Sequence, residues 1–163
     1  MNETRITRSA EETVAYARTF AGRLRRGDIV ALFGELGSGK TQFVKGVCQA
    51  FKSLTPATSP SFVILNRYQG TDERKSELLL YHFDLYRVTS IAEIYDLGYE
   101  EFLHGDGVCL IEWAEMLGEL LPNQRYDVRC SLGSDENERR IEIAGVHAQC
   151  RYLASKHQPR SVR

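Results

Sequence analysis

The chain has 163 residues, the length of one ordinary domain, with 42% hydrophobic residues, 26% charged residues and a formal net charge of −1. This composition argues against a disordered chain, and at this length about 70% of the surface of the unfolded chain can be buried, so no disulfide or metal staple is needed. The absence of a basic excess argues against a protein that binds nucleic acid by itself, although RNA could still be reached through a partner.

The cysteines and the N-terminus bear on the compartment. No two cysteines are close enough in sequence for a C-x-x-C pair, so we expect small core residues rather than a zinc or redox site (Cys48, Cys109, Cys130 and Cys150). The N-terminal residues contain no apolar stretch, which predicts the absence of a signal peptide, and no apolar run approaches the roughly 20 residues that span a bilayer. We therefore expect a reduced, cytoplasmic protein that does not associate with a membrane.

The first third of the chain predicts a helix, a strand and a second helix. A capping box, S-x-x-E, begins at Ser9, and apolar residues recur behind it at helical spacing, which predicts a helix over residues 10–25. The short apolar run at residues 28–33 is typical of a buried strand. Residues 41–51 again have helical spacing, and a loop rich in Ser, Thr and Pro follows at residues 53–60.

The remainder of the chain alternates apolar runs with polar turns, of which residues 69–76 and 133–137 are predicted hairpin turns. The other predicted elements are strands at residues 62–68 and 78–83, a helix at residues 91–102 broken around Gly98, a strand at residues 108–111, a helical turn at residues 115–121, and antiparallel strands at residues 126–132 and 139–144. We expect one domain over residues 1–150 and a basic, solvated tail over residues 151–163.

Residues 34–41, G-E-L-G-S-G-K-T, fit the P-loop pattern G-x-x-x-x-G-K-[ST], with an apolar strand before them and a helix after them. The glycines let backbone N–H groups point at phosphate oxygens, Lys40 supplies a charge for the β- and γ-phosphates, and Thr41 offers a hydroxyl to magnesium. A Rossmann fingerprint is excluded because its third glycine is missing. The expected nucleotide-binding residues of this segment are Glu35, Leu36, Gly37, Ser38, Gly39, Lys40, Thr41 and Gln42.

The nucleotide is expected to be ATP, because the chain has no N-K-x-D sequence of the kind that GTPases use to read guanine. The P-loop also sets the predicted fold class. We expect a single α/β domain with a mixed central sheet, the P-loop strand near its centre, helices on both faces and an antiparallel C-terminal hairpin.

Two apolar runs end in a carboxylate, at Asp84 and at Glu112, in the manner of a Walker B strand. One could hold magnesium while the other orients the attacking water, and the sequence leaves these roles open. An ordinary strand-end or capping carboxylate is the alternative for each. His82 shares a strand face with Asp84, and we interpret it as a hydrogen-bonding residue beside the site.

Three further features have two interpretations each. Residues 58–62, T-S-P-S-F, lie where switch-type P-loop proteins sense the γ-phosphate, but they also fit an ordinary loop. Trp113 is either a core residue or a residue that packs over the site. Arg87 either balances phosphate charge or pairs with a surface carboxylate.

Together, and in this order, these motifs resemble the TsaE family of bacterial P-loop ATPases. The resemblance covers nearly the whole chain, from about Ser9 to Ile143. It includes S-x-E-E-T at residues 9–13, the P-loop, T-S-P-S-F at 58–62, H-F-D-L-Y-R at 82–87, L-G-Y-E-E at 97–101, I-E-W-A-E at 111–115 and L-P at 121–122. The H-F-D-L-Y-R and I-E-W segments are far more specific than the P-loop alone.

The resemblance implies a small cytoplasmic ATPase that is required for threonylcarbamoyl modification of the adenosine next to the anticodon in tRNA. It implies TsaD and TsaB homologues as protein partners, slow hydrolysis of ATP that drives or resets their complex, and contact with tRNA only through that complex. Two rival functions remain, a small-molecule P-loop kinase and a nucleotide-dependent binding module with negligible turnover.

Residue roles carried over from the family follow the motifs. Lys40 would bind phosphate during catalysis, Thr41 and Glu112 would hold Mg²⁺, Asp84 would orient or activate the water, and Ser9 would lie near the base. This sequence departs from the commoner family pattern by conservative changes in the P-loop, where Glu and Ser replace Asp and Ala, and by a serine for a threonine at residue 61.

Overall fold

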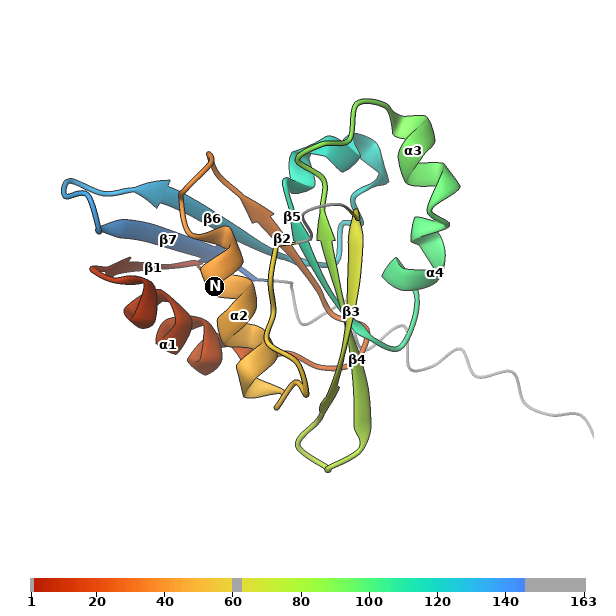
Figure 1. Ribbon diagram of the computed structural model, residues 1–163, viewed down its shortest axis with the longest axis horizontal. Coiled ribbons are helices and arrows are strands. Elements are labelled where there is room, and N and C mark those ends of the chain that lie inside the picture. The colour runs from red at the N-terminus through yellow and green to blue at the C-terminus, as the bar shows by residue number, and fades with distance from the viewer. Residues whose placement is uncertain (1, 60–62, 146–163) are drawn as a thin grey trace, which may run out of the picture.

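The computed structural model of the chain describes residues 2–59 and 63–145, which form a sheet with helices on both faces (Figure 1). The elements are β1 (Asn2–Thr7), α1 (Ala10–Ala21), β2 (Ile29–Phe33), α2 (Lys40–Ala50), β3 (Leu65–Thr71), β4 (Glu77–Asp84), α3 (Ile91–Asp96), α4 (Tyr99–Leu103), β5 (Val108–Glu112), the 3₁₀ helix η1 (Ala114–Leu120), β6 (Tyr126–Leu132) and β7 (Arg139–Ala144).

The sheet has seven strands in the order β1-β7-β6-β2-β5-β4-β3. The P-loop strand β2 lies at its centre and pairs in parallel with β5 on one side and β6 on the other, and β4 pairs in parallel with β5. The outer pairs β3–β4, β6–β7 and β1–β7 are antiparallel. The predicted mixed sheet, central P-loop strand and antiparallel C-terminal hairpin are therefore confirmed.

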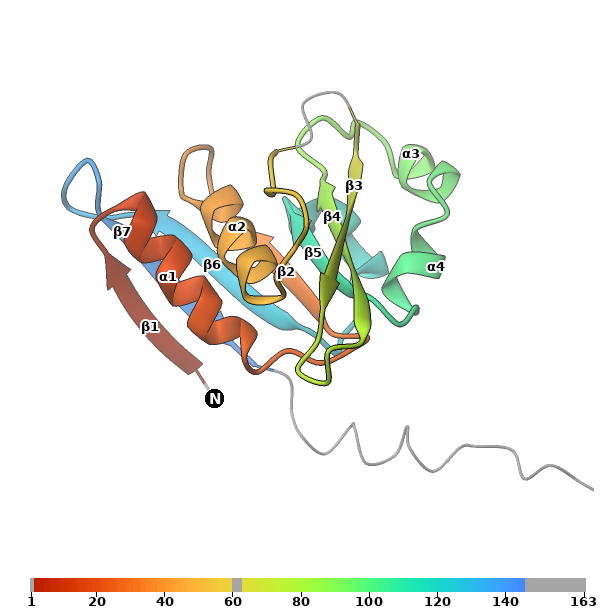
Figure 2. The same cartoon turned by 60° about the horizontal axis from the view of Figure 1, so that its bottom comes forward.

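Helices α1 and α2 lie side by side over one face of the sheet (Figure 2). Their apolar stripes meet in a core around Phe20 and Phe43, whose ring centroids are 5.4 Å apart. The helix α1 ends at Ala21 and not at the predicted residue 25, because residues 22–24 continue as tight turns with bonds to carbonyls three residues back. Leu24 remains buried in that turn, so the apolar spacing outlasts the helix.

The other face of the sheet is covered by α3, α4 and η1, whose apolar residues pack with those of β4 and β5. The predicted break around Gly98 is confirmed, since this residue has a φ of 64° and separates α3 from α4. The predicted helical turn near residues 115–121 is η1. None of the helices in the described part of the chain is both long and apolar enough to cross a bilayer.

Two strand predictions differ from the structure. The strand β1 was not predicted, because it is an edge strand in which only Thr7 is buried and no apolar run marks it. The strand predicted at residues 62–68 begins instead at Leu65 and extends to Thr71, where the backbone also bonds Phe51 and Leu54 after α2. The three residues beyond the predicted end, at positions 69–71, carry no apolar side chain and are held in the strand by backbone pairing with β4. The predicted tail at residues 151–163 lies outside the described residues.

Candidate functional site

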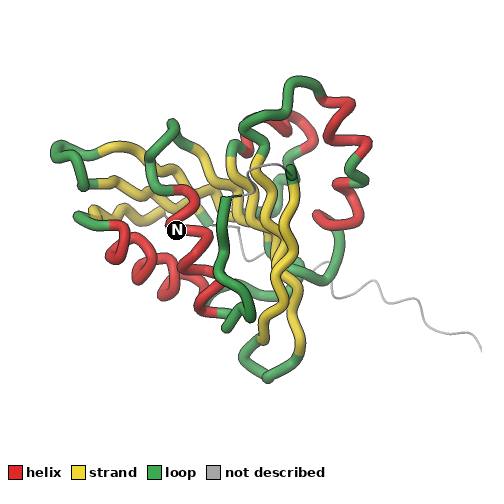
Figure 3. Tube along the Cα trace, viewed as in Figure 1, coloured by secondary structure: helices red, strands yellow, loops and turns green. Residues whose placement is uncertain are grey.

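A cleft of about 570 Å³ is lined by residues of the P-loop and by the last residues of β4 and β5. Figure 3 shows in green the loops that follow the strands of the sheet. The predicted site residues that line it are Ser9, Leu36, Gly37, Gly39, Lys40, Thr41, Gln42, Asp84 and Glu112. Glu35 and Ser38 were also predicted to bind the nucleotide but do not line this cleft. The sequence-distant segments of the motif therefore meet in one place.

The P-loop turns sharply because its glycines adopt backbone angles that other residues rarely take. Gly34 has a φ of 138°, and a Cβ there would lie 2.1 Å from the carbonyl oxygen of Cys130 on β6. Gly39 has a φ of 100° and caps α2 at its N-terminus. The first N–H groups of a helix have no partner within the helix and carry a partial positive charge, so this end of α2 suits an anion.

Lys40 is curled into the loop and is only 5% exposed. Its Nζ donates to the carbonyl oxygens of Gly34 at 2.6 Å and Glu35 at 2.8 Å. The same ammonium lies 4.1 Å from the ring centroid of Trp113, a cation–π contact. Trp113 therefore packs over the site, and burial lowers the pKa of the Lys40 amine.

Glu112 ends β5 inside the cleft and is almost completely buried. The Thr41 hydroxyl lies 3.0 Å from its Oε1 and 3.1 Å from its Oε2, and His82 Nε2 lies 2.9 Å from Oε1. The alternation of side chains along β4 and β5 turns His82 and Glu112 toward α2, because Leu80 and Leu110 point the same way into its core. The interpretation of His82 as a hydrogen-bonding residue beside the site agrees with this geometry.

Asp84 ends β4 and is directly paired with Glu112 across the parallel ladder. Its Oδ2 accepts from the Ser59 hydroxyl at 2.9 Å, and its Oδ1 accepts from the backbone N–H of Tyr86 at 3.1 Å. The two carboxylates thus lie on neighbouring strands, and a residue of the T-S-P-S-F segment contacts one of them. Residues 60–62 of that segment, including Ser61, lie outside the described residues.

Ser9 and the two P-loop residues that do not line the cleft, Glu35 and Ser38, make local hydrogen bonds. The Ser9 hydroxyl caps α1 by accepting from the N–H of Glu12 at 3.1 Å. The Glu35 carbonyl accepts from Lys40 Nζ and from the N–H of Ser38. Ser38 is buried, and its hydroxyl has no hydrogen-bond partner within residues 2–59 and 63–145. These two residues therefore shape the loop, whereas Ser9 also borders the cleft.

Arg139 is a cleft residue that the sequence did not identify. It begins β7, lines the cleft, and its Nε donates to the Gly37 carbonyl oxygen at 3.0 Å. The two residues are 102 positions apart, and nothing in the local sequence marks this arginine. Arg87, predicted either to balance phosphate or to pair at the surface, also lines the cleft.

The chain is similar to known proteins over most of its length. The family model described as threonylcarbamoyl adenosine biosynthesis protein TsaE matches residues 7–141. The protein named tRNA threonylcarbamoyladenosine biosynthesis protein TsaE from Bacillus subtilis is 39% identical over 140 residues, which cover 86% of this chain and 84% of that protein. The protein of the same name from Treponema pallidum is 36% identical over 139 residues, which cover 85% of this chain and 98% of that protein.

A solved structure agrees with this assignment. The crystal structure of Bacillus subtilis YdiB matches with a TM-score of 0.73 and 33% sequence identity, and the match covers 96% of this chain and 93% of that one. The chain therefore shares both its sequence and its P-loop fold with these relatives, and it belongs to the TsaE family.

Proposed function

We propose that the cleft binds ATP with Mg²⁺ and hydrolyses it slowly to ADP and phosphate. The observation that carries the proposal is the partly buried pairing of Glu112 with the hydroxyl of Thr41 at the start of the P-loop helix. Carboxylate and hydroxyl oxygens are ligands that Mg²⁺ prefers, so these two residues fit the ion. When bound, the ion would neutralise charge on the β- and γ-phosphates.

The phosphates are expected to bind along the P-loop. Backbone N–H groups of the loop and of the start of α2 would bind phosphate oxygens, and Lys40 would exchange its two carbonyl partners for the β- and γ-phosphates. The remaining predicted contacts are with Leu36, Gly37 and Gln42. Ser9, at the N-terminus of α1, borders the cleft on the side assigned to the base.

Asp84 is proposed to orient the attacking water. Its two oxygens are held by Ser59 and by the N–H of Tyr86, so the carboxylate is fixed beside Glu112 and still borders the cleft. A fixed carboxylate can accept a hydrogen bond from water and direct it at a phosphorus atom. We therefore assign magnesium to Glu112 with Thr41 and the water to Asp84.

We further propose that this activity serves the threonylcarbamoyl modification of tRNA, as the names of the relatives indicate for those proteins. The chain would act in the cytoplasm through a complex of TsaD and TsaB homologues and would meet tRNA only through them. A formal net charge of −1 supports such an indirect role, since proteins that bind nucleic acid alone are usually strongly basic.

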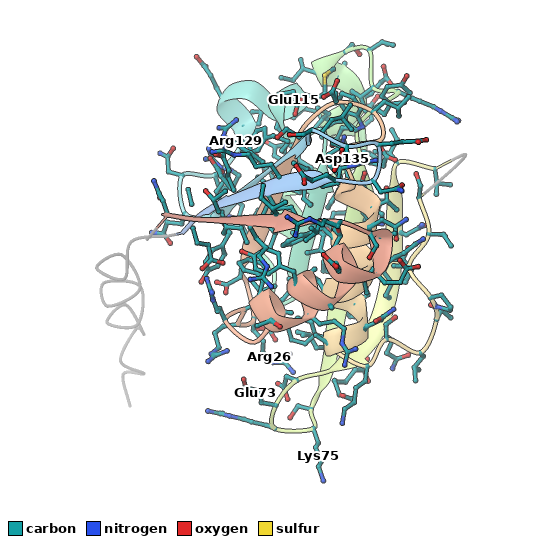
Figure 4. The ribbon with its side chains drawn as sticks, turned by 90° about the vertical axis from the view of Figure 1, so that its left-hand side faces the viewer. Arg26, Glu73, Lys75, Glu115, Arg129 and Asp135 are labelled. Atoms are coloured by element: carbon teal, nitrogen blue, oxygen red, sulfur yellow. The ribbon has the colours of Figure 1, made fainter. Side chains whose placement is uncertain are left out.

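The kinase alternative is weakened by where the β3–β4 hairpin lies. A kinase closes a lid over ATP, and residues 72–76 form the turn of that hairpin. The turn precedes Glu77, the first residue of β4, whereas Asp84 is the last residue of that strand. At the usual rise per strand residue, the turn therefore lies about 23 Å from Asp84. In Figure 4, Glu73 and Lys75 lie at one end of the molecule, and Glu115 and Asp135 lie at the other.

The experiment is phosphate release from ATP and Mg²⁺ without any added acceptor, measured for the native protein and for Asp84→Ala. We expect slow release by the native protein, loss of release in Asp84→Ala, and ATP affinities within about threefold of each other. Release that requires an added acceptor would favour the kinase. Tight binding of ATP without release by the native protein would favour the binding module.

A further inference from the structure

His82 is the buried centre of a row of side chains that crosses three strands. It lies on β4 and is 0% exposed. Its direct partners across the sheet are Asn66 of β3 and Leu110 of β5, and its ring contacts Tyr68 and Glu112, each two residues further along those strands. Its Nε2 lies 2.9 Å from Glu112 Oε1, and its ring stacks on that of Tyr68 with centroids 6.2 Å apart and an interplanar angle of 29°. A carboxylate oxygen only accepts, so Nε2 carries the proton in this bond.

Packing alone does not explain a histidine at this position. The Nδ1 atom of His82 is buried and has no hydrogen-bond partner among the residues that the structure describes. Leaving a buried polar atom unpaired costs about 1–3 kcal/mol, and an apolar side chain in the same core would avoid that cost. The bond from Nε2 to Glu112 is the interaction that an apolar residue could not replace.

Tyr68 connects this pair to the loop that precedes β3. Its hydroxyl accepts from the backbone N–H of Thr58 at 3.2 Å and lies 3.1 Å from the Thr58 carbonyl oxygen, to which it donates. The next residue, Ser59, donates to Asp84. The loop is therefore attached both to the carboxylate proposed to orient water and, through two stacked rings, to the carboxylate proposed to hold magnesium.

We propose that His82 is a positioning residue that fixes the Glu112 carboxylate for Mg²⁺, and that Tyr68 couples the backbone position of Thr58 to this pair. The inference rests on the proposed Mg²⁺–nucleotide site and adds how that site is held. A second residue that orients a metal ligand commonly contributes a factor of 10–100 to metal affinity. The coupling makes the magnesium site sensitive to the conformation of the loop.

The test is a titration with Mg²⁺ at a fixed ATP concentration. The signal is the fluorescence of the single tryptophan, Trp113, which contacts Lys40. The variants His82→Gln and His82→Asn form a matched pair. The amide nitrogen of glutamine occupies the place of Nε2 and can donate to Glu112, whereas that of asparagine occupies the place of Nδ1 and cannot. We expect the Mg²⁺ midpoint to rise about tenfold in His82→Asn and by less than threefold in His82→Gln.

Nucleotide affinity in EDTA should stay within twofold of the native value in both variants, which separates a loss of the metal site from general damage. A melting temperature lowered equally in both variants, with both Mg²⁺ midpoints within twofold of native, would overturn the positioning role. Should His82→Asn not fold, His82→Leu is the substitute, with the same expected tenfold rise. If the ATP affinity of the native protein is the same with and without Mg²⁺, the proposed function itself is overturned.

Tyr68→Phe tests the coupling, because it keeps the stacked ring and removes only the hydroxyl that holds Thr58. We expect it to raise the Mg²⁺ midpoint about threefold in the native background and to have no further effect on His82→Asn. Equal effects of Tyr68→Phe in the two backgrounds would show independent sites and would contradict the coupling.

Discussion

Gly46 lies where α1 packs on α2, and its replacement by alanine should destabilise the fold. A Cβ on Gly46 would lie 2.3 Å from the carbonyl oxygen of Val14 and 2.5 Å from the Cβ of Ala17, both on α1. Because ordinary contacts begin at 3.4 Å, the helix α1 would have to recede by about 1 Å. One of the two atoms belongs to the backbone, so a rotamer change cannot relieve the clash.

Two opposing terms decide the size of the effect. Alanine is favoured over glycine by about 1 kcal/mol in a helix interior. Overpacking a closely packed core costs about 1–3 kcal/mol, and the backbone contact places this case at the upper end. We therefore expect Gly46→Ala to lose about 2 kcal/mol of unfolding free energy and about 4–8 °C of melting temperature, measured by urea and thermal denaturation.

The exposed position Gln49 on the same helix supplies the control, since Gln49→Ala also introduces an alanine into α2, but at an exposed site and in place of a residue that already favours a helix. Its stability should remain within about 0.5 kcal/mol of the native value. A Gly46→Ala protein as stable as the native one, or more stable, would refute the close approach of the two helices.

Three further outcomes are expected. Burial raises the pKa of three thiols to about 12 from an ordinary value of 9.0, so in Cys150→Ser these thiols should not react with Ellman's reagent at pH 8 until the protein unfolds (Cys48, Cys109 and Cys130). Rapid labelling of the folded protein would contradict this account. The contribution of these protonated thiols to stability is complete below about pH 9 and is lost as the pH rises toward 12, so the unfolding free energy should fall over that range. Burial lowers the pKa of Lys40, so its charged ammonium lowers the stability of the folded state at neutral pH. Lys40→Met should therefore raise the melting temperature while abolishing ATP binding, and a lower melting temperature would contradict this. Thr41→Val removes only the hydroxyl, so calorimetry should give it the same ATP affinity with Mg²⁺ as the native protein has in EDTA, whereas an unchanged Mg²⁺ effect would exclude Thr41 as a ligand.

Burial decided which parts of the fold could be predicted from the sequence. The strands β2 and β5 are buried on both faces, so each is a continuous apolar run that marks its own position. The strand β1 is held by backbone pairing with β7 at the sheet edge, and a mostly polar segment carries no signal of that kind. The early end of α1 was also not predictable, because Leu24 stays buried after the helix has stopped.

The site shows the same division between local and distant information. Lys40, Thr41 and the strand-end carboxylates follow from short motifs, because each is placed by the element that contains it. Arg139 reaches the P-loop across 102 residues, and this contact depends on the packing of β7 and not on any local pattern. The link from Tyr68 to His82 likewise depends on the register between β3 and β4.

The central claim is that this ATP site serves a complex of TsaD and TsaB homologues, and co-purification with those proteins tests it most directly. The tagged chain would be mixed with TsaD and TsaB homologues from one organism, with ATP and Mg²⁺ or with EDTA, and the retained proteins would be measured. We predict that both are retained, and more strongly with ATP and Mg²⁺. Failure to retain either protein under any of these conditions would contradict the account.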